Sequence, residues 1–80
     1  MKIGEAIKKR INELCSERGI SVNKLATISG ITQSTLNNIV CGRNNSTTVS
    51  TLQKICDGLE ISITDFFTAE CFLNVEQEIE

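Results

Sequence analysis

Hydrophobic residues recur every three or four positions through most of this chain, which is the spacing of amphipathic helices. The first such stripe consists of Ile3, Ile7, Ile11 and Leu14. It predicts a helix from about Lys2 to Arg18, and Gly19 follows as the residue that ends it. Because β-branched residues fall at helical rather than alternating spacing, the pattern predicts an all-α domain.

Two shorter stripes follow, and each is preceded by a hydroxyl side chain. Ser21 and Thr32 are predicted helix N-caps, Gly30 lies in the turn between the two helices, and Gly42 stops the second helix. The predicted buried residues are Leu25, Ala26 and Ile28 in the first helix and Leu36, Ile39 and Val40 in the second. Two helices joined by such a turn form a helix-turn-helix, which can lay its second helix in the major groove of DNA.

Two more helices are predicted beyond a polar loop at residues 43–47. Thr48 can cap a fourth helix, whose predicted buried residues are Leu52, Ile55, Cys56 and Leu59. Ser62 and Asp65 fit a capping box and predict a short fifth helix that begins near Ile63. The chain is therefore expected to form one five-helix domain.

Residues 68–80 leave two alternatives open. Phe72, Val75 and Ile79 recur at helical spacing, whereas the run 71–75 could equally form a short strand. This apolar stripe either folds back on its own domain or meets the same stripe of a second subunit. We divide the chain into a helix-turn-helix domain at 1–67 and an acidic C-terminal extension at 68–80, which is a candidate dimer contact.

Composition argues against several classes of function. The chain has no His, the usual general base and the commonest metal ligand, and no paired carboxylates or Gly-rich phosphate loop point to an enzyme. The four Cys are spread along the chain without a C-x-x-C pair, so we expect reduced thiols in a cytoplasmic protein and no metal site. No cofactor or small-molecule ligand is expected. No apolar run approaches the ~20 residues that a membrane span needs.

Charge is distributed unevenly along the chain. Residues 1–54 hold all eight basic and three acidic residues, a net charge of +5, whereas residues 55–80 hold seven acidic residues and no basic one. The overall charge of −2 thus conceals a basic body with an acidic end. Since affinity for phosphate follows the local field, this distribution permits DNA binding, although two ordinary solvated faces would give the same pattern.

The exposed side of the second helix of the motif is neutral and rich in amides. It is formed by Gln33, Ser34, Asn37 and Asn38, with Cys41 among them. Surface helices usually carry Lys and Glu at such positions. An amide offers a donor and an acceptor together, which matches the major-groove edge of adenine. Gln33, Ser34, Asn37 and Asn38 are therefore the predicted base-reading residues.

Contacts to the DNA backbone are expected on both sides of that helix. Arg43 and Asn44 follow it directly. The free backbone N–H groups at the start of the first helix of the motif, near Val22 and Asn23, attract anions, and Lys24 lies beside them.

At these residues the chain resembles the phage repressor/Cro-type helix-turn-helix family, over about Ile7 to Phe67. The matching segments are GISVNKLA (19–26), GITQSTLNNIVCGR (30–43), TVSTLQKICDGLEI (48–61) and DFF (65–67). The resemblance implies a five-helix, lambda-repressor-like domain that binds double-stranded operator DNA, usually as a two-fold homodimer. It also implies base reading by the four side chains named above, and backbone contacts by Arg43, Asn44 and the start of the first motif helix.

Three positions depart from the family pattern. The family often has Gln at the position of Val22, where it commonly touches a phosphate, so that contact should be weaker here. It often has Arg at the position of Cys15 and an acid at the position of Val40, and these two form an ion pair. Replacing both ends of a buried ion pair can be neutral, whereas losing one end is costly, so we predict that Cys15 and Val40 touch.

The sequence thus predicts a small, sequence-specific DNA-binding transcriptional regulator, a homodimeric repressor that occludes its operator. The alternative is a protein-interaction module of the same fold, such as an antitoxin or anti-repressor, with little DNA affinity. The acidic end and Val22 favour this alternative, whereas the amide-rich face and Arg43 favour DNA binding. A steep fall of DNA affinity with salt would distinguish the regulator.

Overall fold

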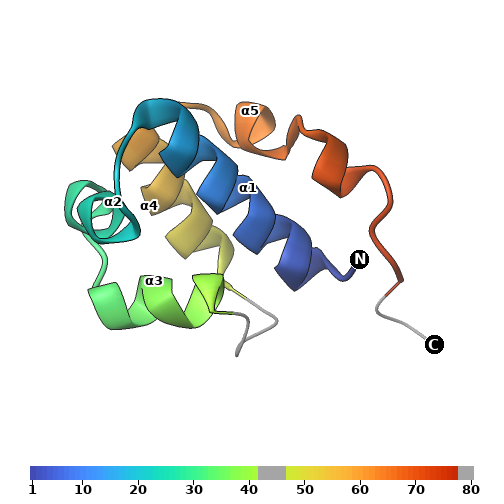
Figure 1. Ribbon diagram of the computed structural model, residues 1–80, viewed down its shortest axis with the longest axis horizontal. Helices are drawn as coiled ribbons and strands as arrows, with labels where there is room; N and C mark the ends of the chain where they lie inside the picture. Colours follow the sequence, from blue (N-terminus) through green and yellow to red (C-terminus); the bar gives the residue numbers. More distant parts are fainter. Residues whose placement is uncertain (42–46, 78–80) are drawn as a thin grey trace.

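Regular structure is entirely helical in the part of the chain that the computed structural model describes, residues 1–41 and 47–77. The elements are α1 (Ile3–Arg18), α2 (Val22–Ser29), α3 (Gln33–Val40), α4 (Val49–Leu59), α5 (Ile63–Phe67) and a 3-10 helix, η1 (Glu70–Phe72). In Figure 1, α2 lies at one end of the long axis, the segment after α5 at the other, and α3 along the lower edge. The predicted all-α, five-helix architecture is confirmed.

Side-chain caps explain where four of the helices begin. In each case a hydroxyl accepts a hydrogen bond from the backbone N–H three residues later, at a donor–acceptor distance of 3.0 or 3.1 Å. The capping residues are Ser21, Thr32, Thr48 and Ser62, as the sequence predicts. Such a cap stabilises a helix by about 1 kcal/mol.

Two of the helix ends follow the predicted glycine pattern, whereas α4 ends at a non-glycine residue. Gly19 and Gly30 end α1 and α2 with φ of 64° and 71°, in the left-handed region that glycine adopts without strain. Glu60 ends α4 in the same region, with φ of 58°. The α3 helix ends at Val40 with Cys41 as its C-cap. The predicted helix stop, Gly42, lies outside the described residues.

The hydrophobic core draws on all five helices. Its largest fully buried side chains are Phe66, Ile11, Leu25, Leu36, Ile55 and Leu59. The predicted core positions are confirmed with two exceptions: Val40 is only half-buried, and Ile28 is 41% exposed. In this turn of α2 the buried residue is Ser29 rather than the predicted Ile28.

A close approach of α2 to α4 explains why Ile28 faces outward. A Cβ atom on Gly58 of α4 would lie 3.0 Å from the Cα of Ser29 and 3.1 Å from the carbonyl oxygen of Ile28. The two helix backbones therefore leave room for a small side chain at this crossing and not for isoleucine. The Ser29 hydroxyl is buried there without a hydrogen-bond partner among the described residues.

The tail, residues 68–77, folds back onto α1. It forms neither the continuous helix nor the strand that the sequence left open, because only η1 is regular and residues 75–77 adopt no secondary structure. Phe72 packs against the core, and its ring centroid lies 4.9 Å from that of Phe67. The N-terminal amine of Met1 pairs with Glu76 at 2.9 Å and holds the pKa of that carboxyl below its usual range.

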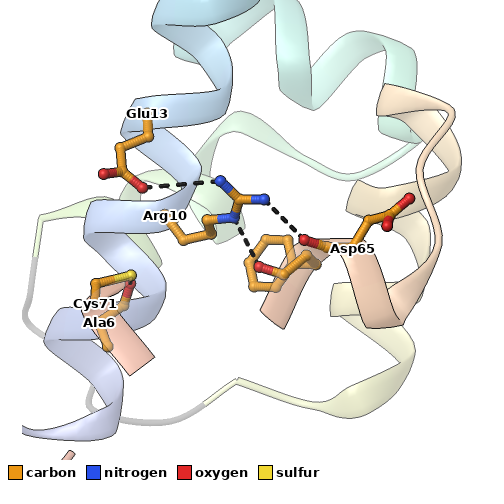
Figure 2. Close-up of polar contacts among 6 residues, drawn as sticks. Ala6, Arg10, Glu13, Asp65 and Cys71 are labelled. Carbon is orange, nitrogen blue, oxygen red and sulfur yellow. Dashed lines mark hydrogen bonds and ion pairs between the residues drawn. The ribbon is translucent and has the colours of Figure 1, made fainter. Parts of the chain in front are cut away.

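Arg10 joins α1 to the end of α5. Its Nε and Nη2 atoms donate to the carbonyl oxygens of Phe66 and Asp65 at 2.7 and 2.8 Å, as Figure 2 shows. One turn earlier in α1, the Cys71 thiol of the tail contacts the carbonyl oxygen of Ala6 at 3.5 Å. These contacts hold α5 and the described part of the tail against α1.

All four cysteines are free thiols. Cys15 and Cys56 are buried, and burial raises the pKa of each thiol. Cys15 belongs to the core cluster against which Val40 packs, and their direct contact stays a prediction. Cys41 is exposed at the end of α3, as expected.

Candidate nucleic-acid interface

Two short helices and a tight turn make up the candidate site. The α2 helix ends at Gly30, and α3 begins one residue after the N-cap Thr32. Backbone hydrogen bonds from Gly30 N to Thr27 O, 3.3 Å, and from Ile31 N to Ala26 O, 3.2 Å, close the end of α2. This geometry is the helix-turn-helix that the sequence predicts, with its second helix supported by the core beneath it.

The α3 helix divides into a buried side and an exposed polar side. Leu36 is fully buried and Ile39 is 6% exposed, which anchors the helix. The four predicted base-reading residues, Gln33, Ser34, Asn37 and Asn38, are all exposed. Among the described residues, none of their side chains has a hydrogen-bond partner. The structure thus presents them together, and their role in base reading stays a prediction.

The predicted backbone-contact residues are placed less uniformly. Asn23 and Lys24 are exposed at the start of α2, where the Ser21 hydroxyl accepts a hydrogen bond from the backbone N–H of Lys24. The Val22 side chain packs partly against the core, which leaves only its backbone N–H for a ligand. Arg43 and Asn44 lie outside the described residues.

Thr35 is a residue of this surface that sequence reasoning missed. It is exposed on α3, and its hydroxyl lies 2.8 Å from the Thr32 hydroxyl in a direct hydrogen bond. Thr32 also accepts the Thr35 N–H, so the pair stiffens the first turn of α3. A threonine three residues after a threonine N-cap was the available signal, and Thr48 and Thr51 repeat the same arrangement at the start of α4.

The net charge counted along the sequence does not show where each charged residue lies relative to the candidate site. The Arg10 guanidinium donates to two carbonyl oxygens of α5, so this positive charge is used in a contact within the domain. The described part of the tail, residues 68–77, packs on α1 and lies away from the start of α3 in Figure 1. Gln33, the first residue of α3, is exposed, so this part of the tail does not cover it.

Within residues 1–41 and 47–77, no three His, Cys, Asp or Glu side chains are grouped closely enough to hold a metal ion. In the same residues, no helix has the length and apolar character needed to cross a membrane.

Comparison with known proteins identifies the family. The model of the Cro/C1-type helix-turn-helix DNA-binding domain matches residues 10–71. The chain belongs to this Cro/C1-type family. The matched region begins at Arg10 and ends at Cys71, so it includes both residues that hold the tail and α5 against α1.

Three known proteins are similar to this chain. The HTH-type transcriptional regulator SlrR of Bacillus subtilis (strain 168) is 36% identical over 56 residues, which cover 70% of this chain and 37% of SlrR. The crystal structure of prophage Lp1 protein 11 has a TM-score of 0.81 and 36% identity, covering 94% of this chain and all of that one. An HTH_3 family transcriptional regulator from Vibrio cholerae has a TM-score of 0.77 and 32% identity, covering 86% of this chain and 38% of that one.

Proposed function

We propose that this Cro/C1-type domain is a sequence-specific regulator of transcription that lays α3 in the major groove of DNA. The observation that carries the proposal is the exposed, uncharged face of α3, where Gln33, Ser34, Asn37 and Asn38 have no other described partner. Asn is a mediocre helix former, so these amides add little to the stability of α3. They can, however, form hydrogen bonds with base edges in the major groove.

The start of α3 is the end directed at the bases in this motif. Gln33 and Ser34 occupy its first two positions, with Asn37 and Asn38 one turn later. Gln or Asn pairs in a bidentate manner with the N6 and N7 atoms of adenine. Asn23, Lys24 and the N–H groups near Val22 would hold one phosphate, while Arg43 and Asn44, which follow α3 in the sequence, would hold another.

The regulator acts as a homodimer on a near-palindromic site, with its two α3 helices in major grooves about 34 Å apart. Repression by occlusion of the operator follows as the simplest mechanism, since the described helices are used in building the DNA-binding domain itself. Selection of binding sites from random DNA tests this directly. Two inverted half-sites support the proposal, whereas recovery of no enriched sequence contradicts it.

Replacing Gln33 with alanine should weaken binding to the best site by roughly 1–3 kcal/mol and relax the preference at one base pair. The physical reason is the loss of a bidentate amide contact from the first position of α3. A titration of labelled duplexes with each base pair varied in turn measures both effects. Unchanged specificity would remove Gln33 from the set of base-reading residues.

Replacing Arg43 with alanine should instead weaken all DNA sequences alike. It should also reduce the slope of log affinity against log salt by about one, because one phosphate contact is lost. Affinities for the best site and for an unrelated duplex, measured over a series of salt concentrations, check this result. Lys54→Ala on α4 is a matched control of the same charge. A sequence-selective loss in Arg43→Ala would assign that side chain to base reading.

Val22 supports the alternative function, a protein-interaction module with little DNA affinity. Its side chain packs against the core and offers no polar group where the family often has Gln. The same salt series separates the two functions, since such a module shows no salt-dependent DNA affinity even at low salt.

A further inference from the structure

The surface formed by α1 and the tail combines exposed apolar side chains with charged ones. A hollow of about 400 Å³ lies between these segments and is lined by Met1, Lys9, Glu70, Cys71, Leu73 and Asn74. Leu73 is 77% exposed and Met1 is 41% exposed, and Phe67 beside the tail is 37% exposed. Three of the five exposed large hydrophobic residues in the described chain are thus on or next to the tail.

Lys9 and Glu70 give this hollow two opposite charges. Both side chains are exposed, and neither forms an ion pair with another described residue. They line the same hollow without pairing with each other. In a two-fold dimer, a residue pair formed once is formed a second time with the partners exchanged. A two-fold arrangement that brings Lys9 of one copy to Glu70 of the other therefore forms this opposite-charge pair twice.

We infer that this surface, defined as Met1, Lys9, Glu70 and Leu73, binds a second copy of the chain. Apolar side chains surrounded by charged ones have the composition of a protein interface, with an apolar centre and a polar rim. The arrangement in Figure 1 agrees, because the tail lies at the end of the long axis opposite α2, and docking there leaves α3 of each copy uncovered. The inference rests on the proposed two-fold DNA binding and names the surface that creates it.

The internal anchors of the tail make this surface rigid enough to dock. The Phe72 ring packs inward against the core, Cys71 contacts Ala6, and the backbone N–H of Glu76 donates to the Met1 carbonyl at 2.9 Å. Because these residues hold the tail, Leu73 is left pointing into solvent. Fixing the tail in advance reduces the entropy lost on association.

A charge-reversal mixing experiment tests the inference. In Lys9→Glu both intersubunit pairs become Glu–Glu, and in Glu70→Lys both become Lys–Lys, so each variant should dimerise at least about tenfold more weakly than the wild type. In an equimolar mixture the heterodimer regains two opposite-charge pairs, so dimers should return. Sedimentation of the full chain without DNA measures all three samples, and circular dichroism verifies that each variant is folded.

Two controls complete the design. Lys54→Glu reverses an exposed charge on α4, away from this surface, and should leave dimerisation unchanged. Leu73→Ser should weaken the wild-type dimer and the mixed dimer alike. A monomeric wild type, a mixture that stays monomeric, or single variants that dimerise as well as the wild type would each overturn the inference.

Binding to a duplex that carries one half-site separates this inference from the proposed function. If the charge variants bind the half-site as the wild type does, the variants retain the DNA surface and the sedimentation result concerns the dimer contact alone. If dimers behave as expected while no DNA is bound, the proposed function fails and the assignment of the surface stands.

Discussion

Replacing Arg10 with alanine is expected to reduce the free energy of unfolding by about 3 kcal/mol. The guanidinium donates to two carbonyl oxygens at the end of α5, and hydrogen bonds to a charged donor are worth about 1.5–3 kcal/mol each. An 80-residue domain is stable by only about 4–12 kcal/mol, so the loss is a large share of the total. Urea unfolding of the wild type and the variant measures it.

The geometry of Arg10 also dictates the controls. Lysine retains the charge but has no planar fork to reach both carbonyls, so Arg10→Lys should show an intermediate loss. Glu13 lies 3.9 Å from Arg10 at a partly exposed position, and Glu13→Ala should change stability by less than about 1 kcal/mol. If Arg10→Ala lowers the free energy of unfolding no more than Glu13→Ala does, the contacts to α5 do not account for the contribution of Arg10 to stability.

Replacing Gly58 with alanine is expected to destabilise the domain by about 2–3 kcal/mol, although alanine is the better helix former. In a free helix the change would gain up to about 1 kcal/mol. Here the added Cβ would meet the backbone of α2 at 3.0 and 3.1 Å, and forcing two packed helices apart costs more than that gain. Because α2 supports α3, DNA affinity should also fall under conditions where the variant is folded.

A double-mutant cycle with Ser29 sharpens this prediction. The Ser29 hydroxyl is the nearest atom to the added Cβ and has no hydrogen-bond partner among the described residues. Ser29→Ala alone should therefore leave stability unchanged or raise it, since it removes an unsatisfied buried group. In that background Gly58→Ala should be less harmful by about 1 kcal/mol, and thermal unfolding of the four proteins measures the coupling. Strict additivity would show that the hydroxyl does not limit the approach of α2 to α4.

Much of the fold could be predicted because its signals are local. The N-caps at Ser21, Thr32, Thr48 and Ser62 act within three residues, and the apolar stripes reflect a period of 3.6. The exposed face of α3 could be predicted for the same reason, since a helical wheel places Gln33 and Asn38 away from Leu36. The sequence does not single out Thr35, because its hydroxyl bond to Thr32 adds to an N-cap that Thr32 alone already predicts.

The errors came where two distant parts of the chain meet. Hydrophobicity favours Ile28 over Ser29 for burial, but the helical period places Ser29 on the same side of α2 as Leu25 and Ala26. Gly58 of α4 packs against that side, where a small residue fits. The tail carries an apolar stripe at helical spacing, yet it does not form a continuous helix. Phe72 packs against Phe66 and Phe67 of α5, and the chain there forms only the short 3-10 helix η1.

By itself, then, the sequence determined five helices, their caps, and the amide-rich side of α3, because each depends on residues within a turn or two of one another. The tertiary structure alone decided the role of Arg10, which binds carbonyls more than fifty positions away, the helix crossing at Gly58, and the side of the molecule that the acidic tail occupies. Those features depend on which helices approach each other, and no periodicity in the sequence encodes the distance between two helix backbones.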